Sequence, residues 1–163
     1  MLEVRAKVSI RSSPRVIWEY MNNVEGWWTL SSADHVSLEF SSAEHSLKEG
    51  VRATLKEQFG NIKGESQGII TKVIPDKEVM WRSERAVYSY LFFDIPVDQI
   101  VTWSVQEQKD GVALSMEVRL VFSNTLWGKI CEWYFVYMLR GKRLVADHSF
   151  NELMYIKRVI EGG

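Results

Sequence analysis

The chain has 163 residues, is 46% hydrophobic and carries a formal net charge of −1, which is the size and balance of one folded domain over residues 1–163. A nucleic-acid-binding domain normally shows a basic excess, so this charge argues against a nucleic-acid partner. The one cysteine, Cys131, excludes an intrachain disulfide, and the N-terminus lacks the apolar core of a signal peptide. These features are typical of a cytoplasmic protein.

The first elements expected along the chain are one strand and two short helices. Apolar and charged residues alternate over residues 2–10, as in a strand with one buried face. Ser13 followed by Pro14 is typical of a helix N-terminus. A second short helical turn is expected to hold Trp27 and Trp28. We expect the two helices to close one open side of a curled sheet, with Trp28 at the edge of the enclosed space.

Between residues 34 and 122 the apolar pattern has a period of two almost throughout, which predicts six more strands. One face of these strands is apolar and the other polar, as in an antiparallel sheet that is covered on one side. In the first of these strands Val36 belongs to the apolar, inward set. The Asp110-Gly111 pair is a two-residue hairpin signal, and it would pair Val105 with Met116.

A turn centred near Ile62 sets the expected register of an earlier hairpin. It would pair Leu55 with Ile69 and place Glu57 opposite Gln67. This register turns both polar side chains inward. Such residues either lie at strand ends that water reaches or form a polar ring that orients the head group of a ligand.

The C-terminal part of the chain is expected to be one long helix from about residue 125 to residue 160. Its apolar residues follow spacings of three, four and seven, which give a single apolar stripe. At about 1.5 Å per residue such a helix reaches roughly 50 Å, enough to cross the whole sheet. Gly141 is the place where a kink is expected.

The order of these elements and several local phrases resemble the START-related (SRPBCC) superfamily, including its polyketide cyclase/dehydratase and coenzyme Q-binding branches. The phrases are SSPRVIWEYMNNVEGWW near the start, VIPDKEVMWRSE and VTWSVQEQKDGVALSMEVRLVF in the strands, and LWGKICEWYF before the last helix. The resemblance implies an α+β helix-grip fold, in which a seven-stranded antiparallel sheet curls around a long C-terminal helix and encloses a hydrophobic cavity. The superfamily includes lipid and sterol carriers, quinone binders, cyclases and ring-oxygenase domains, so the resemblance does not fix the function.

Strand parity and the helix stripe together predict which side chains line the cavity. The residues expected there are Trp28, Leu55, Ile69, Trp81, Trp103, Val105, Met116, Val118, Leu139 and Phe150.

The segment 86–96 is expected to be a long connection rich in aromatic and aliphatic side chains. Contiguous exposed apolar residues usually mark a binding surface, so we expect a movable lid that touches a membrane or a protein partner. The alternative is that Phe92 and Phe93 cap the core. The residues expected at the cavity mouth are Glu57, Gln67, Tyr88, Tyr90, Phe92, Phe93, Gln99 and Trp127.

The sequence shows few catalytic or metal-binding signals. His35, His45 and His148 have no other His or Cys at ligand spacing, so neither a metal site nor a permanent metal or nucleotide cofactor is expected. For His148 a surface or packing role is preferred over a place in the cavity. If the chain is an enzyme, Glu57 and Tyr88 are the candidates for handling protons.

The function expected from these observations is binding or transport of an apolar or amphipathic small molecule, such as a lipid, an isoprenoid quinone or a polyketide. One alternative is an enzyme of the polyketide cyclase, aromatase or dehydratase kind that uses the same cavity. Another is a protein-interaction module like the co-chaperone members of the superfamily. Catalysis needs paired titratable groups deep in the cavity, and the sequence predicts none there, which favours binding.

Overall fold

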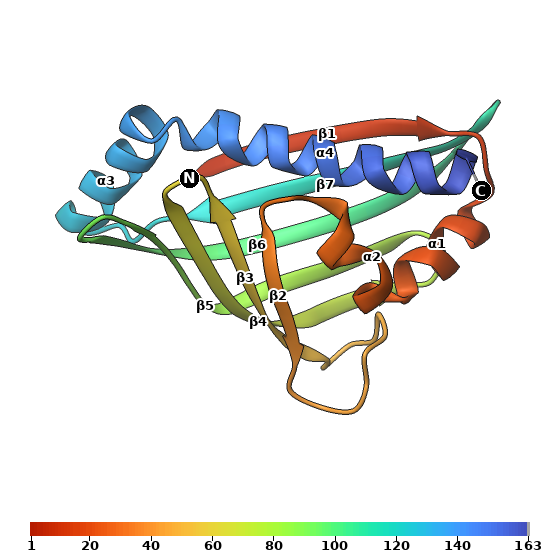
Figure 1. Cartoon of the computed structure of the whole chain (residues 1–163), viewed down its shortest axis with the longest axis horizontal. Helices are drawn as coiled ribbons and strands as arrows, with labels where there is room; N and C mark the ends of the chain where they lie inside the picture. The colour runs from red at the N-terminus through yellow and green to blue at the C-terminus, as the bar shows by residue number, and fades with distance from the viewer. Residues whose placement is uncertain (163) are drawn as a thin grey trace.

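The computed structural model describes residues 1–162, which form one curled antiparallel sheet, three α-helices beside its concave face and a fourth at its end (Figure 1). The elements in chain order are β1 Leu2–Ile10, α1 Pro14–Asn22, α2 Val24–Ser31, β2 His35–Phe40, β3 Arg52–Phe59, β4 Ile62–Ile74, β5 Glu78–Tyr90, β6 Phe93–Gln108, β7 Gly111–Val121, α3 Leu126–Trp133, the π-helical turn η1 Tyr134–Met138 and α4 Gly141–Gly162.

The seven strands are hydrogen-bonded in the order β1-β7-β6-β5-β4-β3-β2, and every neighbouring pair is antiparallel. Helix α4 lies along the concave face and packs on β1 and β7, while α2 links α4 to β2 (Figure 1). The α+β helix-grip architecture expected from the sequence is confirmed. None of the helices within residues 1–162 has the length and apolar character needed to cross a membrane.

The start of α1 follows from its local sequence. The hydroxyl of Ser13 accepts a hydrogen bond from the backbone N–H of Val16 at 3.4 Å, and Pro14 occupies the first helical position. Beyond α1, the indole of Trp27 donates to the carbonyl of Met21 at 2.8 Å, which ties α2 to α1. Both tryptophans of α2, including Trp28, are buried.

The expectation of one continuous C-terminal helix is wrong, because the helix breaks between η1 and α4. Arg140 has φ of 54°, a left-handed conformation that ends the first helical segment. A Cβ on the next residue, Gly141, would lie 2.2 Å from the ring of Phe135, so only glycine fits there. With 22 residues, α4 spans about 33 Å.

The expected register between β3 and β4 is also wrong. It is displaced by three residues, and because this is an odd number the side chains of β4 face the opposite way from the prediction. The turn is a two-residue Gly60-Asn61 loop, so Leu55 lies opposite Ser66 rather than Ile69. As a result Ile70 is the buried residue and Ile69 lies on the outer face. The β6–β7 hairpin is displaced by two residues, which preserves parity.

The segment 86–96 is not a long connection. Residues 86–90 pair with residues 93–97 and form a hairpin that extends the sheet, with Leu91 at φ of 53° in its two-residue turn. The side chain of Phe92 at the tip is fully exposed. Because both arms are hydrogen-bonded strands, the long connection expected from the sequence is wrong, and a movable lid stays a prediction for the tip of this hairpin.

Candidate functional site

Two adjoining cavities lie between the sheet and the helices. The larger has a volume of about 50 Å³ and the smaller about 30 Å³. These volumes leave room for a few water molecules, whereas small-molecule pockets usually measure about 300–1,000 Å³. Side chains therefore fill most of the interior. The residues that line both cavities are Trp28, Leu55, Trp81 and Trp103.

Six of the expected cavity residues line these spaces: the four shared ones and, around the smaller cavity, Met116 and Val118. The other four expected residues do not. Ile69 faces outward because of the β4 register, Val105 is buried outside both cavities, Leu139 lies at the helix break, and Phe150 is 48% exposed because α4 turns its other face inward.

The expected mouth residues separate into two groups. Glu57, Tyr88 and Gln99 line the smaller cavity, although the side-chain oxygen of Gln99 already accepts a hydrogen bond from Ser66 at 2.8 Å. Gln67 is exposed on the outer face of the sheet.

The remaining mouth residues, Tyr90, Phe92, Phe93 and Trp127, gather near the tip of the β5–β6 hairpin and line neither cavity. The larger cavity is instead lined by α2 and by Leu47 of the connection between β2 and β3. Of the expected mouth residues, only Glu57, Tyr88 and Gln99 therefore border a cavity.

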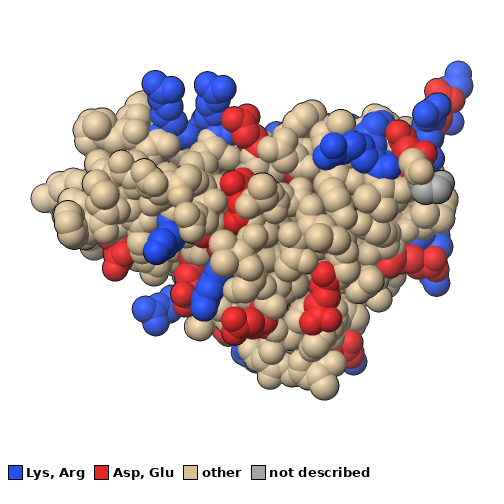
Figure 2. Space-filling model, viewed as in Figure 1, with Lys and Arg blue, Asp and Glu red and all other residues tan. Residues whose placement is uncertain are grey.

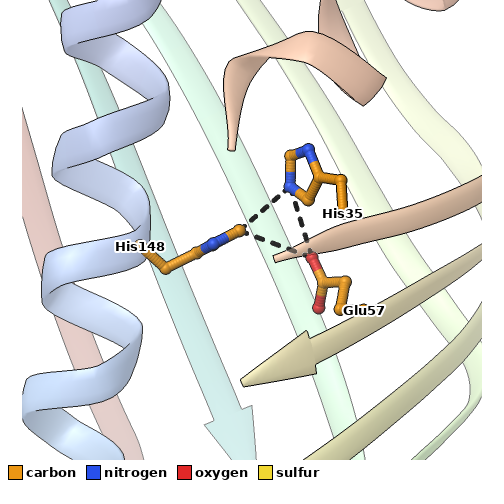
Figure 3. Close-up of side chains that lie close together, drawn as sticks. All are labelled: His35, Glu57 and His148. Carbon is orange, nitrogen blue, oxygen red and sulfur yellow. Dashed lines mark hydrogen bonds and ion pairs between the residues drawn. The ribbon is translucent and has the colours of Figure 1, made fainter. Parts of the chain in front are cut away.

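Three ionisable side chains converge beside the smaller cavity: His35 from β2, Glu57 from β3 and His148 from α4 (Figure 3). The two Nε2 atoms of the histidines lie 3.2 Å apart. Oε1 of Glu57 lies 3.7 Å from Nε2 of His35 and 3.4 Å from Nε2 of His148. We refer to these three residues as the His–Glu cluster.

A β-bulge at the start of β2 aims His35 into the interior. The strand register shifts between His35 and Ser37, so Val36 is the extra residue and points to solvent. His35 then lies directly opposite Glu57 on β3, and Leu38 further along β2 still packs on the core. The expectation that Val36 faces inward is wrong for this reason.

Hydrogen bonds fix the orientation of both imidazoles. Nδ1 of His35 contacts the backbone carbonyl of Trp28, and the Trp28 indole stacks on the imidazole with ring centroids 3.7 Å apart. Nδ1 of His148 lies 3.3 Å from Oδ2 of Asp34 and 3.3 Å from Oγ of Ser32. Because a carbonyl oxygen only accepts hydrogen bonds, Nδ1 of His35 carries the proton and its Nε2 presents a lone pair to the cluster.

The two histidines have opposite electrostatic environments. Burial lowers the pKa of His35 to about 4, against the smaller opposing effect of Glu57. Burial also acts to lower the pKa of His148, but Glu57, Glu152 and Asp34 together outweigh it and raise that pKa to about 9. At neutral pH His148 is thus the cation of the cluster and His35 is neutral.

Glu152 lies one helical turn after His148 and adds a buried carboxylate. Its side chain is 1% exposed, its Oε2 lies 3.7 Å from Nε2 of His148, and its Oε1 has no hydrogen-bond partner among the described residues. Burial raises the pKa of Glu152 to about 7. Within residues 1–162, no lysine or arginine nitrogen lies within 4 Å of the carboxylates of Asp34, Glu57 or Glu152.

Three further polar groups face the interior. The indole N–H groups of Trp81 and Trp103 are buried without a partner among the described residues, and both side chains line the two cavities. Tyr88 is also buried, and burial raises the pKa of its phenol well above the usual value. Its hydroxyl is therefore a hydrogen-bond donor at any physiological pH.

Sequence reasoning missed the His–Glu cluster because its members are far apart along the chain. His35 and His148 are separated by 113 residues, so local ligand spacing was the wrong criterion. The inference that the cavity lacks paired titratable groups is also wrong. A usable signal was present in α4, where His148 and Glu152 share the buried face with Val145 and Leu153.

No family model and no curated protein matches this sequence. Among solved structures, the protein TTHA0849 from Thermus thermophilus is similar with a TM-score of 0.69 and 14% identity, covering 97% of this chain and 96% of that one. A START superfamily protein from Mycobacterium smegmatis has a TM-score of 0.64 and 9% identity, with 99% of each chain covered.

The di-domain ARO/CYC StfQ from the steffimycin biosynthetic pathway has a TM-score of 0.69 and 8% identity, covering 99% of this chain and 51% of that one. These likenesses show the fold of this chain, a helix-grip fold that it shares with these three structures.

Proposed function

We propose that this protein binds a small, mainly apolar molecule that carries a hydrogen-bond-accepting group. The observation that carries the proposal is the pair of unpartnered indole donors, Trp81 and Trp103, in the walls of an otherwise apolar space. A buried N–H without a partner costs about 1–3 kcal/mol, and an acceptor oxygen on a ligand would remove that cost. A carbonyl-bearing molecule such as a quinone or a polyketide meets this requirement.

The polar end of such a ligand would lie toward the His–Glu cluster. Glu57, His148 and Glu152 all line the smaller cavity, whereas the larger cavity has almost no polar wall. An apolar body in the larger cavity and a polar group in the smaller one therefore match the two halves of the space. This arrangement supports an amphipathic ligand over a purely apolar one.

Binding requires side chains to move, because the two cavities are smaller than any such ligand. The connection 41–51 between β2 and β3 contains neither helix nor strand and contributes Leu47 to the wall of the larger cavity. A segment without regular structure opens more readily than a paired strand. We therefore propose that the ligand enters between this connection and α2, which both line the larger cavity.

The test uses a short benzoquinone, 2,3-dimethoxy-5-methyl-1,4-benzoquinone, titrated into the protein by calorimetry. We expect one molecule per chain, with affinity reduced about two- to tenfold in Trp81→Phe and in Trp103→Phe, since each loses one hydrogen bond. The matched control is Trp133→Phe, which changes an exposed tryptophan on α3 and leaves the affinity unchanged. Undetectable binding, or equal affinity in all three variants and the unmodified chain, would contradict the proposal.

A second candidate is an enzyme of the cyclase or dehydratase kind. The observation that favours it is that the phenol of Tyr88 and the carboxylate of Glu57 line the same small cavity. An intramolecular aldol condensation needs an acid that donates a proton to the carbonyl oxygen and a base that removes a proton from a carbon next to a carbonyl group. Tyr88→Phe should then abolish turnover of a synthetic diketone while leaving benzoquinone binding intact. If the unmodified chain binds the benzoquinone but does not turn over the diketone, the enzyme function is contradicted and only the carrier function stands.

We place the docking surface of this carrier at the end of the molecule where α3 meets the β5–β6 hairpin (Figure 1). Phe93 stacks on Trp127 and Tyr134, which joins the hairpin to α3 and η1. The exposed apolar side chains here, which we call the apolar end, are Leu91, Phe92, Leu126, Trp127, Trp133, Tyr137 and Met138.

Charge around the apolar end favours an anionic lipid surface as its partner. Figure 2 shows this end as mostly uncharged, with basic side chains above it. Lys129, Arg140 and Lys142 form no ion pair among the described residues. Exposed apolar groups rimmed by unpaired basic side chains are typical of interfacial membrane binding.

A further inference from the structure

The three facing atoms of the His–Glu cluster have the spacing of metal ligands. They form a triangle with sides of 3.2, 3.4 and 3.7 Å. The circle through its corners has a radius of about 2.0 Å, so a point exists about 2.1 Å from all three atoms, the usual Zn–N and Zn–O distance. One ion can therefore contact both Nε2 atoms and Oε1 without any change in the backbone.

The same triangle indicates the coordination geometry. Ligands at about 2.1 Å lie about 3.4 Å apart in a tetrahedral site and about 3.0 Å apart at neighbouring positions of an octahedral site. The observed separations agree with the tetrahedral value. Imidazole nitrogens with one carboxylate suit zinc and its neighbours in the first transition row better than Mg²⁺ or Ca²⁺, which prefer oxygen ligands.

The outer contacts of both histidines are those that orient metal ligands. A ligating histidine usually donates its other N–H to a carbonyl or carboxylate, which points the free lone pair at the ion. His35 meets this condition through the carbonyl of Trp28, and His148 through the carboxylate of Asp34. The stacked indole of Trp28 further holds the His35 ring in place.

A separate observation comes from Glu152. This carboxylate is almost fully buried, has an oxygen without a partner among the described residues, and lies 3.7 Å from the Nε2 of His148. The cluster and its neighbours hold three carboxylates, those of Asp34, Glu57 and Glu152, with no lysine or arginine nearby within residues 1–162. Of these, Glu57 and Glu152 are largely buried, with side chains 12% and 1% exposed, and His148 is the one cation beside them. Burying carboxylates together is costly unless cations accompany them, and a divalent ion in place of the His148 proton offsets more of that cost.

We propose that His35, Glu57 and His148 bind one divalent transition-metal ion of the zinc class, with a fourth coordination position open toward the smaller cavity. The fourth position would take water or an oxygen of the bound molecule. Glu152 is placed to accept a hydrogen bond from that water, since it lines the same cavity. The site needs no cavity ligand to form, so it stands or falls independently of the proposed carrier function.

The test begins with protein treated with a chelator and dialysed into metal-free buffer. Zn²⁺ alone is then titrated by calorimetry, and Co²⁺ alone by visible absorption. We expect one ion per chain, a Kd at or below about 1 μM, and the intense visible bands of four-coordinate Co²⁺. His35→Ala, Glu57→Gln and His148→Ala should each weaken Zn²⁺ binding by about 100-fold or more.

The matched control is His45→Ala, because His45 lies in the connection between β2 and β3 and takes no part in the cluster. Its Zn²⁺ affinity should equal that of the unmodified chain. Glu57→Gln keeps the size and shape of the side chain, and near-ultraviolet circular dichroism confirms that it is folded. Zn²⁺ binding weaker than about 100 μM, a weak six-coordinate Co²⁺ spectrum, or unchanged affinity in folded Glu57→Gln and His35→Ala would overturn the proposal.

Discussion

The His–Glu cluster and the apolar end depart from the usual distribution of side chains in opposite directions. The cluster places ionisable groups in the interior, where His148 and Glu152 are buried between α4 and the sheet. The apolar end exposes Phe92 and Leu126 to solvent, at positions where a polar side chain would be well hydrated. One region is polar inside and the other is apolar outside.

The difference indicates what kind of external partner would stabilise each region. A buried carboxylate such as Glu152 is stabilised by a cation, and an exposed ring such as Phe92 is stabilised by an apolar surface. For the first need the described residues supply only His148, one cation beside the carboxylates of Asp34, Glu57 and Glu152, and for the second they supply nothing. The two regions therefore call for different external partners, an ion in one case and a lipid surface in the other.

The largest expected effect comes from removing the cation of the cluster. His148→Leu leaves Asp34, Glu57 and Glu152 together without their imidazolium, and breaking a buried pair from one side costs about 3–5 kcal/mol. The free energy of unfolding of the metal-free variant, measured by urea denaturation, should fall by that amount. Adding Glu152→Leu to the same chain should restore part of the loss, because one of the stranded carboxylates is gone.

His45→Ala is the control for this measurement, with an expected change within about 0.5 kcal/mol. A loss of less than about 1 kcal/mol in His148→Leu would show that the cluster is solvated rather than buried.

A smaller effect is expected at the apolar end. The double variant Leu91→Ser with Phe92→Ser removes two exposed apolar side chains from the hairpin tip, and each is worth about 1.5–3 kcal/mol when it enters an apolar phase. Cosedimentation with vesicles that contain phosphatidylserine should therefore fall at least about tenfold. Stability should change by less than about 0.5 kcal/mol, since neither residue packs on the core.

The matched control is Val16→Ser with Val36→Ser, which removes two exposed apolar residues outside the apolar end. If both double variants lose vesicle binding equally, or neither does, the apolar end has no special role. A large loss of stability in the hairpin variant would place its side chains in the core instead.

The smallest effect is expected at Arg140, which connects the two regions by ending η1 before α4 begins. Arg140→Gly relieves the left-handed backbone at φ of 54°, so stability should rise by about 0.5–1 kcal/mol. The midpoint of thermal unfolding should then rise by about 1–4 °C. Arg140→Ala keeps the unfavourable backbone and should give no gain. A decrease in both variants would show that the arginine side chain itself stabilises the helix break.

Much of the fold is predictable because its signals are local. The cap formed by Ser13 and Pro14 and the period-two pattern of the strands depend only on neighbouring residues. The same locality explains the errors. The parity of β4 depends on the two-residue loop at Gly60-Asn61, and the alternation of apolar residues around Ile69 and Ile70 fits either register.

The candidate site was less predictable, because single-residue irregularities place its members. The bulge at Val36 turns His35 inward, against the alternation of the rest of β2. His148 becomes a partner of His35 only when α4 crosses the concave face of the sheet. Glu57 was the one member found from the sequence, because it continues the inward alternation of β3, although the register that placed it opposite Gln67 was wrong.

The contact between His35 and His148 also affects the exposed edges of the sheet. An open seven-stranded sheet has two edges, here β1 and β2, and each carries unpaired amides that another chain could use for pairing. Helix α4 packs directly on β1, and through His148 it also contacts the start of β2. Both edges are thus attached to one helix, and the sheet and helix together make a closed ring. In hydrogen-exchange terms, we expect the first amides of β2 to exchange together with those of α4, whereas a free edge would fray alone.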